Sequence, residues 1–362
     1  MIYQEYVNSP GRAHRKGIGM VSAVKKFGDP VKAADWLADL RWPEERHCPY
    51  CGGPETSTAT HKSMPYWCKD CRKYFSLKTG TLMASSRVPV EKWTLLAYNF
   101  MTNLKSISAM KIHRDLEVRE ATAWHMLHRM MEGFVYDDVP EEFATGTEFQ
   151  VDECYIGGLE ANKHRIDRIP NSHGGATKMI IIGITEKESR KVWMDVIPDT
   201  RSRTIARIID RIIPEDSIIY TDEARHYSKV RRKRIAVNHS RKEYVKPYDA
   251  FDGMSRQAST NITESAWSHL TRSITGVHHK MSPKHLQRYV KAFAGRWNIR
   301  DLDTEEQMAI IFQRMLGHSL DYETLTSDNG LPSGSGKEGA YYPERRSRYT
   351  GKFRYKKQRK KA

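Results

Sequence analysis

The sequence predicts an α/β protein with a mixed β-sheet, and three features lead to this fold class. Hydrophobic residues make up 39% of the 362 residues, enough to bury a core. Beyond residue 147, the spacing of apolar residues changes from helical to strand-like. Three strand-like segments then precede a helical segment and two further strands, an order typical of a mixed sheet with flanking helices. The expected strands are Glu148 to Ile156, Met179 to Thr185, Lys191 to Ile197, Ser217 to Tyr220 and Arg234 to Val237.

Helical periodicity accounts for most of the remaining chain. One helix is expected between the third and fourth strands, at Arg203 to Ile213, and two more at about 262–274 and 283–297. The N-terminal half is expected to be helical at 20–40, 90–104, 106–114 and 120–131, with a polar linker from Pro140 to Thr147.

The length predicts two or three domains, at about 150 residues each. The composition divides the chain into five blocks. They are an N-terminal helix and cysteine region at 18–85, a helical region at 86–139, the α/β domain at 145–300, a helical extension at 301–325, and a linker with a basic tail at 326–362.

The strong positive charge predicts a polyanionic partner. The net charge is +16 and the sequence pI is about 9.5. Nucleic acid and an anionic membrane both fit such a charge. The longest purely aliphatic run, Met179 to Ile182, is far shorter than the ~20 residues of a membrane span. The first 17 residues are polar, so no signal peptide is expected. Nucleic acid is therefore the favoured partner.

Much of this charge lies at the C-terminus. Residues 341–362 contain ten Lys or Arg against one acid, Glu344, and alternate cations with Tyr349, Phe353 and Tyr355. Such a tail suits phosphate attraction and base stacking. The alternative is a solvated basic tail that adds only non-specific affinity.

Four of the five cysteines lie in two close pairs that predict a metal site. Cys48, Cys51, Cys68 and Cys71 form a C-x2-C-x16-C-x2-C pattern, typical of zinc held by four thiolates. Four ligands leave no open position on the ion, so one structural zinc is expected. Four unrelated buried cysteines are the alternative. Metal-bound thiolates also indicate a reducing, cytoplasmic compartment.

Two short helical patterns flank a break near residues 115–118 and predict a helix-turn-helix. An ordinary helical hairpin would give the same periodicity. The second helix would place several polar side chains outward, toward base edges or phosphates: Arg119, Glu120, Thr122, His125, His128 and Arg129.

Three acidic residues in the α/β region are candidates for a catalytic metal site. Asp152 lies inside the first expected strand, and Asp222 follows the fourth. Glu264 falls one turn into the next helix, where Thr260 is expected to cap the helix and Glu264 to point inward near Trp267. Carboxylates in such positions can hold two Mg²⁺ ions for phosphodiester chemistry. Taken singly, each acid is weak evidence for such a site, because most Asp and Glu side chains are solvated surface residues. Glu153 must face away from Asp152 on a strand.

Beyond these features, the chain closely resembles the ISXO-type insertion-sequence transposases over about residues 18–300. The resemblance depends on the following motifs: Trp42-Pro43, Cys48-Pro-Tyr-Cys51-Gly, Cys68-Lys-Asp-Cys71-Arg-Lys-Tyr-Phe-Ser, Thr79-Gly80-Thr81, Val151-Asp152-Glu153, Tyr155-Ile156-Gly157-Gly158, Tyr220-Thr221-Asp222-Glu223, Val237-Asn238-His239-Ser240, Glu243-Tyr244-Val245, Thr260-Asn261, Glu264-Ser265 and Ser282-Pro283-Lys284-His285-Leu286-Gln287-Arg288-Tyr289.

The resemblance implies a zinc ribbon, a helix-turn-helix and a ribonuclease-H-like DDE domain. It implies that Asp152 and Asp222 are catalytic and bind Mg²⁺ or Mn²⁺, two ions in all. The third position is Glu264 or Asn261, with Glu264 favoured because a carboxylate neutralises the metal charge. The family commonly has a lysine seven residues after the acid. This chain has Thr271 there, and its neighbour Arg272, about 100° further around the helix, is the expected phosphate contact.

The function expected from this resemblance is a DNA transposase that cleaves the ends of its element and joins them to target DNA. Its partners would be the terminal inverted repeats and target DNA, bound by a homo-oligomer near the nucleoid of a prokaryotic cytoplasm. The alternatives are a catalytically decayed or repurposed DNA-binding protein and a stand-alone nuclease of the same fold. Intact Asp152, Asp222 and Glu264 favour the transposase over the decayed copy.

Overall fold

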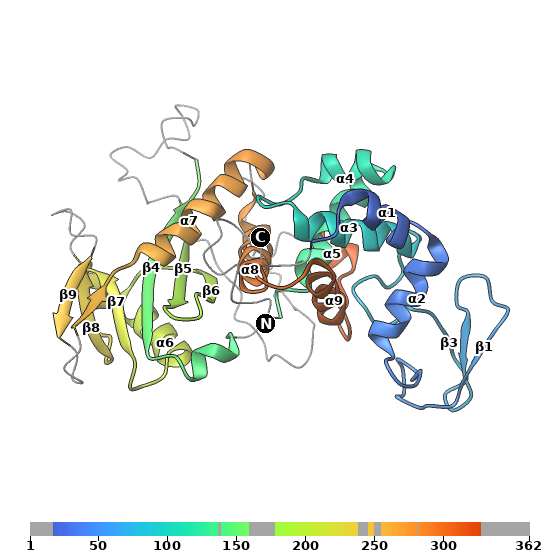
Figure 1. Cartoon of the computed structure of the whole chain (residues 1–362), viewed down its shortest axis with the longest axis horizontal. Helices are drawn as coiled ribbons and strands as arrows, with labels where there is room; N and C mark the ends of the chain where they lie inside the picture. The colour runs from blue at the N-terminus through green and yellow to red at the C-terminus, as the bar shows by residue number, and fades with distance from the viewer. Residues whose placement is uncertain are drawn as a thin grey trace, which may run out of the picture. The chain divides into compact units, whose positions relative to one another are not determined.

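The structure is a computed structural model that describes residues 17–136, 139–158, 178–237, 245–249, 255–279 and 281–326 (Figure 1). The described residues form two compact units. The first contains residues 17–136 and 299–326, and the second contains the described residues between them. The expected basic tail and most of its linker, residues 327–362, lie outside the described residues.

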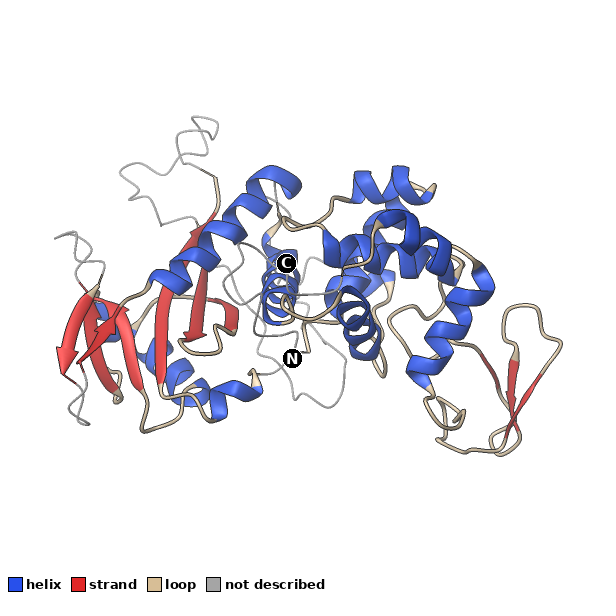
Figure 2. Cartoon of the chain, in the orientation of Figure 1, coloured by secondary structure: helices blue, strands red, loops and turns tan. Residues whose placement is uncertain are grey.

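The first unit is mainly helical (Figure 2). Its helix α9 packs against α2 and α3, so the expected extension at 301–325 joins the N-terminal helices. The helices of this unit are α1 (Met20–Phe27), α2 (Pro30–Arg41), α3 (Val90–Thr102), α4 (Ala109–Leu116), α5 (Glu120–Glu132), α9 (Thr304–Arg314) and α10 (Tyr322–Thr326).

The helical segment expected at 20–40 is two helices. The first ends at Phe27, with Gly28 as its C-cap. Asp29 begins the second, because its side chain accepts hydrogen bonds from the N–H groups of Val31 (3.0 Å) and Lys32 (2.9 Å). Pro30 occupies the first turn of α2, where its missing N–H costs nothing. The helix cap at Asp29 therefore divides the segment into two helices, although the spacing of its apolar residues suggests one.

A three-stranded antiparallel sheet holds the cysteine region. It consists of β1 (Thr56–Thr58), β2 (Tyr66–Cys68) and β3 (Tyr74–Phe75). The guanidinium of Arg41, at the end of α2, donates hydrogen bonds to the carbonyls of Leu77 (2.5 Å) and Thr79 (2.6 Å). These bonds connect the chain that leaves the small sheet to the helical part of the unit.

The second unit is built on the five-stranded mixed sheet that the sequence predicts, which confirms the fold class. The strand order is β6-β5-β4-β7-β8. β4 and β5, and β5 and β6, pair antiparallel, whereas β7 pairs parallel with both β4 and β8. The strands are β4 (Glu148–Ile156), β5 (Met179–Glu186), β6 (Val192–Ile197), β7 (Ile218–Asp222) and β8 (Lys233–Val237).

Helices cover both faces of this sheet. α6 (Ser202–Ile212) packs on one face with the 3-10 turns η1 (Glu141–Ala144) and η4 (Arg225–Tyr227). α7 (Asn261–Ser273) and α8 (Pro283–Asn298) pack on the other. A π-helical turn, η6 (Ile274–His278), follows α7. The strands supply one apolar row to each face, as in β5, where Ile182 and Ile184 face α6 and Ile181 faces α7 and α8.

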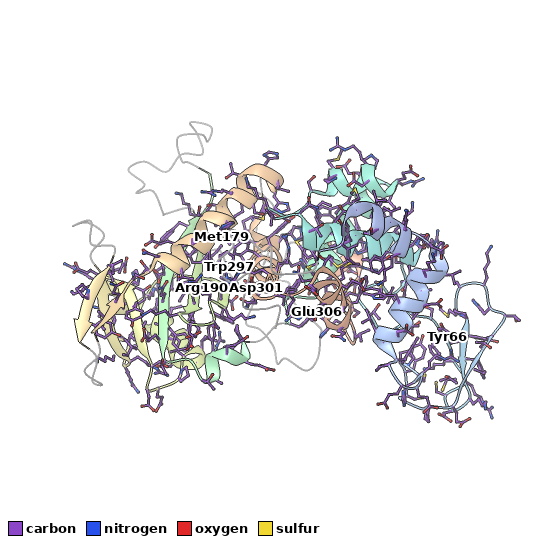
Figure 3. The ribbon with its side chains drawn as sticks, viewed as in Figure 1. Tyr66, Met179, Arg190, Trp297, Asp301 and Glu306 are labelled. Atoms are coloured by element: carbon purple, nitrogen blue, oxygen red, sulfur yellow. The ribbon has the colours of Figure 1, made fainter. Side chains whose placement is uncertain are left out.

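The C-terminal end of α8 is held against the β5–β6 hairpin. Trp297 Nε1 donates to the carbonyl of Arg190 (3.0 Å), two residues that Figure 3 labels. The side-chain amide of Asn298 exchanges two hydrogen bonds with the backbone of Val192, each 2.8 Å long. Asn298 therefore satisfies the backbone of Val192 at the edge of β6 as a residue of a paired strand would.

One local expectation was wrong, and one element was missed. The segment Pro140 to Thr147 is no simple polar linker, because Phe143 in η1 is fully buried against Phe149, with ring centroids 5.1 Å apart. A two-stranded hairpin, β9 (Lys246–Asp249) and β10 (Ser255–Ala258), was not anticipated, since these four-residue strands contain few apolar residues.

In the described part of the chain, no helix combines the length and apolar character that crossing a bilayer requires.

Candidate active site

Parallel pairing of two central strands brings Asp152 and Asp222 together. In the β4–β7 register, Gln150 lies opposite Tyr220, and each aspartate lies two residues further along its strand. Paired residues of parallel strands share a face of the sheet, and neighbouring strands lie about 4.8 Å apart. The two carboxylates are thus adjacent on the face that α7 and α8 cover.

The Asp152 carboxylate is largely enclosed. It accepts one hydrogen bond from Trp267 Nε1 (3.0 Å). Burial raises its pKa from 3.8 to about 7, and the negative charges of Glu153 and Asp222 add to the shift. An enclosed carboxylate beside two other negative charges favours a bound proton or a cation.

Trp267 reaches Asp152 because a glycine lies beneath its ring. Gly183 is the β5 residue opposite Asp152. A Cβ atom at Gly183 would lie 2.5 Å from Trp267 Cζ2 and 2.7 Å from Cη2, so only glycine leaves room for the indole at this position.

The start of α7 is fixed by Gln150, and not by Thr260 as the sequence suggested. The buried Gln150 side chain accepts from the N–H groups of Ile262 (2.9 Å) and Thr263 (3.2 Å). The Thr260 hydroxyl donates instead to Glu264 Oε1 (2.7 Å). Because Gln150 lies two residues before Asp152 on β4, this cap places the first turn of α7 beside the aspartates.

Glu264 and Asn261 both lie on that first turn, three residues apart and on one side of the helix. Glu264 is partly buried and Asn261 is exposed. Of the described residues, the four cysteines are the only group of three or more potential metal ligands whose donor atoms all lie within 4.8 Å of one another. The structure therefore places Asp152 and Asp222 on neighbouring strands, but the carboxylate oxygens of these two residues and of Glu264 do not all lie within 4.8 Å of one another.

A second group of polar side chains, which the sequence analysis missed, lies on the opposite face. Glu153 is almost fully buried there and accepts from Tyr227 Oη (2.7 Å) and interacts with His226 Nε2 (2.9 Å). The hydrogen bond to Glu153 raises the pKa of His226. The opposite orientation of Glu153 and Asp152 agrees with the alternation expected on a strand. The only signal in the sequence was that His226 and Tyr227 closely follow Asp222.

The four cysteine sulfurs have the spacing of a tetrahedral zinc site. Cys48 Sγ lies 3.6 Å from Cys71 Sγ, and Cys51 Sγ lies 3.7 Å from Cys68 Sγ. Zn–S bonds of about 2.3 Å in a tetrahedron separate the sulfurs by about 3.8 Å. Partial burial and hydrogen bonds with the other three thiols raise the pKa of Cys71 to about 12, so a cation is needed to keep four thiolates together.

The expected helix-turn-helix corresponds to α4 and α5. Residues 117–119 connect the helices, and Glu117 adopts the left-handed conformation (φ 49°) that turns the chain. Arg119, at the N-cap of α5, is exposed, and so is Arg272, in the last turn of α7. His125 is partly buried, and burial together with the Arg129 charge lowers its pKa to about 4.

The expectation that His128 and Arg129 face outward was wrong. Both are buried, at 0% and 8% exposure. Arg129 donates from Nε to the Leu320 carbonyl (3.1 Å) and from Nη1 to the Ala84 carbonyl (2.8 Å). The chain from residue 299 onward returns to cover this side of α5, which the periodicity of α5 alone could not reveal.

The comparisons with known proteins agree with these features. Residues 144–298 match the ISXO2-like transposase domain, and residues 29–74 match the transposase zinc-ribbon domain. An uncharacterized protein in transposable element ISH50 of Halobacterium salinarum is 26% identical over 310 residues, covering 81% of this chain and 99% of that protein. A pre-cleavage Mos1 transpososome structure matches at 10% identity over 54% of this chain and 74% of that chain, with a TM-score of 0.18, too low to support an inference.

The two domain matches and the Halobacterium relative support a transposase role for this chain. It resembles the ISXO-type insertion-sequence transposases, because it matches both their zinc-ribbon domain and their transposase domain, as the sequence motifs predicted.

Proposed function

We propose that this transposase cleaves the ends of its insertion sequence and joins them to target DNA by two-metal phosphoryl transfer. The observation that supports this most strongly is the adjacency of Asp152 and Asp222 on parallel strands, with a raised pKa at Asp152. Carboxylate oxygens are the ligands that Mg²⁺ and Mn²⁺ prefer, so the residues present fit these ions. A bound cation would lower the pKa of Asp152 and keep it ionised.

Each side chain has a distinct proposed role. Asp152 and Asp222 hold the metal ions, and Trp267 orients Asp152 through its N–H. When bound, the metal pair stabilises the attacking and leaving oxygens of the phosphodiester. Glu264 is the proposed third ligand, reached by a side-chain rotation that gives up its bond with Thr260. Asn261 is the weaker second contact.

The remaining proposals concern DNA and zinc. One structural zinc bound to the four cysteines supports the ribbon. Duplex DNA, as terminal repeats and as target, binds through α5 and the basic tail, with Arg119, His125 and Arg272 as proposed contacts. Strand transfer at two element ends favours a homo-oligomer assembled on the DNA.

The decisive experiment compares strand cleavage by Asp152→Ala and Asp222→Ala with the wild type in Mg²⁺. Each should bind DNA at least as well as the wild type, because negative charge is removed, and should lose cleavage by orders of magnitude. Glu223→Ala is the matched control, since it removes an exposed carboxylate next to Asp222. Normal cleavage by Asp152→Ala would refute the site.

The third ligand is tested with Glu264→Gln and Asn261→Ala across a Mg²⁺ and Mn²⁺ titration. Glu264→Gln should lose cleavage and Asn261→Ala should retain part of it. The reverse result would show that the amide is the third residue. In the same assay, cleaved ends that never join to target DNA would indicate a stand-alone nuclease, and DNA binding without cleavage would indicate a decayed copy.

A further inference from the structure

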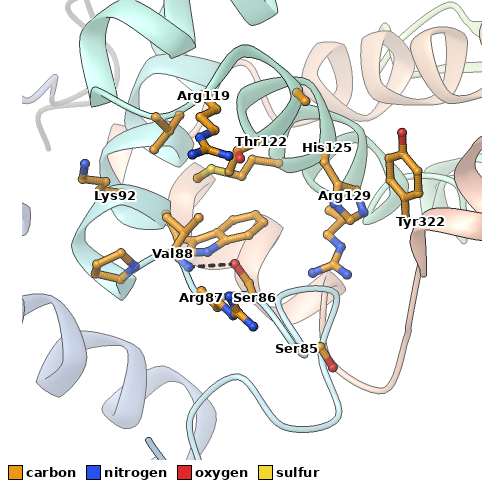
Figure 4. Close-up of a pocket in the computed structure, with 15 residues that line it drawn as sticks. Ser85, Ser86, Arg87, Val88, Lys92, Arg119, Thr122, His125, Arg129 and Tyr322 are labelled. Carbon is orange, nitrogen blue, oxygen red and sulfur yellow. Dashed lines mark hydrogen bonds between the residues drawn. The ribbon is translucent and has the colours of Figure 1, made fainter.

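A basic pocket of about 510 Å³ lies in the first unit, where α3 and α5 begin (Figure 4). It is lined by Arg87, Lys92, Arg119 and Arg129, and by hydroxyl side chains that include Ser86 and Thr122. None of its lining residues is acidic. Asp321 lies close enough to Arg129 to offset part of its charge, but the four cations leave a net positive potential, which favours an anionic ligand.

The four cations differ in how firmly they are held. Arg129 is buried and bonded to backbone carbonyls, and Lys92 Nζ donates to the Leu116 carbonyl (2.7 Å), so these two form a fixed positive wall. Arg87 and Arg119 are exposed. Their guanidinium groups can therefore close on a ligand oxygen at little structural cost.

Two helix N-termini add to the positive potential. α3 begins after Pro89 and α5 after Arg119, and both N-cap residues line the pocket. Neither helix has a side-chain cap hydrogen bond. Each helix is 13 residues long, so its dipole favours negative charge at this end, which Glu91 in α3 and Glu120 in α5 supply in part.

A buried donor without an acceptor also lines the pocket. Trp93 is 0% exposed, and its Nε1–H has no hydrogen-bond partner among the described residues. A buried N–H without an acceptor is unfavourable and uncommon in folded proteins. The Nε1 atom is itself enclosed, so an anion in the pocket would act on it through its charge and not through a direct hydrogen bond.

We propose that this pocket binds one phosphate group of the DNA backbone and so fixes the register of α5 on the duplex. This proposal rests on the proposed DNA transposase function. α5 is the second helix of the helix-turn-helix, the element that enters the major groove with its N-terminal end toward the bases. A phosphate held at that end positions the helix without reading sequence. The pocket volume lies within the range of ligand clefts, enough for a phosphate and its flanking sugars.

The first test follows the Trp93 indole N–H by ¹⁵N NMR in the full chain with Asp152→Ala, which prevents cleavage. The signal is assigned with Trp93→Phe. Inorganic phosphate and a terminal-repeat duplex are titrated separately, at constant ionic strength. The duplex should shift the Trp93 signal in this protein and not in one that also contains Arg87→Ala and Arg119→Ala. The matched control replaces Lys25 and Lys105, two exposed cations outside the pocket, and should retain the shift.

The second test neutralises single phosphates of the duplex as methylphosphonates. At one position, the methylphosphonate should weaken DNA binding by the Asp152→Ala protein roughly tenfold, because a charge-assisted contact is lost. In the variant that also contains Arg87→Ala and Arg119→Ala, the same methylphosphonate should weaken binding less than about twofold. The lysine control should remain as sensitive as the Asp152→Ala protein.

Each outcome decides between sources of the ligand. A shift with the duplex alone, or with duplex and inorganic phosphate, supports the proposal. A shift with inorganic phosphate alone would mean a free-phosphate site and overturn the DNA assignment. No shift with either, or equal methylphosphonate sensitivity in the arginine variant, would overturn the pocket itself. Strand cleavage by the wild type is measured separately. Absence of phosphate binding at the pocket would therefore not contradict the proposed transposase function, and absence of cleavage would not contradict phosphate binding at the pocket.

Discussion

Replacing Gly183 with alanine should disturb the candidate active site without touching any charged residue. The added Cβ would lie 2.5 Å from Trp267 Cζ2, well inside van der Waals contact, while Thr263 Cγ2 limits movement on the same side (3.4 Å). The indole must therefore tilt away from the sheet. Its hydrogen bond to Asp152 is then lost or lengthened.

The expected decrease in the free energy of unfolding of Gly183→Ala has two contributions. Overpacking of a well-packed core costs about 1–3 kcal/mol. Loss of a hydrogen bond to a charged group costs about 1.5–3 kcal/mol, but only for the fraction of Asp152 that is ionised. We therefore expect the free energy of unfolding to fall by about 2–4 kcal/mol. The pKa of Asp152 should rise further above about 7, which weakens divalent-metal affinity at neutral pH.

Urea denaturation of the metal-free protein measures the first effect, and Mn²⁺ titration measures the second. Gly158→Ala is the control, because a Cβ there meets no atom within 4 Å. Trp267→Phe removes the two atoms that clash, so the double variant should be less destabilised than the sum of the single variants. Unchanged stability and metal affinity in Gly183→Ala, or full additivity, would refute this account of how Trp267 supports Asp152.

Three further predictions concern pH, zinc and salt. Folding raises the pKa of Asp152 from 3.8 to about 7, so the metal-free folded protein keeps a proton that the unfolded chain releases. Its stability should fall as pH rises through that window, by up to about 4 kcal/mol relative to Asp152→Asn, and saturating Mg²⁺ should abolish the difference. Elemental analysis should find about one zinc per chain, and chelation should make residues 45–79 protease-sensitive; a ribbon that stays fully folded without metal would contradict this. Deleting residues 341–362 should flatten the salt dependence of DNA affinity but preserve sequence preference, and loss of all discrimination would argue otherwise.

Local sequence patterns were sufficient to predict most helices and strands and the four cysteine ligands of the zinc ribbon. The segment Glu148 to Ile156 forms a strand with the bounds read from its sequence, because apolar alternation and β-branched residues act locally. The four cysteines cluster as their spacing predicted, since two-residue gaps leave few other geometries for both sulfurs of a pair. The neighbouring positions of Asp152 and Asp222, in contrast, depend on the parallel pairing of β4 and β7, which these local patterns did not predict.

Only the tertiary structure decided which partner each side chain meets. The periodicity of α5 could not show that residues near Leu320 return to cover Arg129, so a buried, bonded arginine looked like an exposed one. Gln150, and not Thr260, caps α7, and Glu153 pairs with His226 and Tyr227, through contacts between residues more than 70 positions apart. A sequence specifies the faces of an element through local sterics, but the neighbour on each face depends on how distant segments fill a common volume.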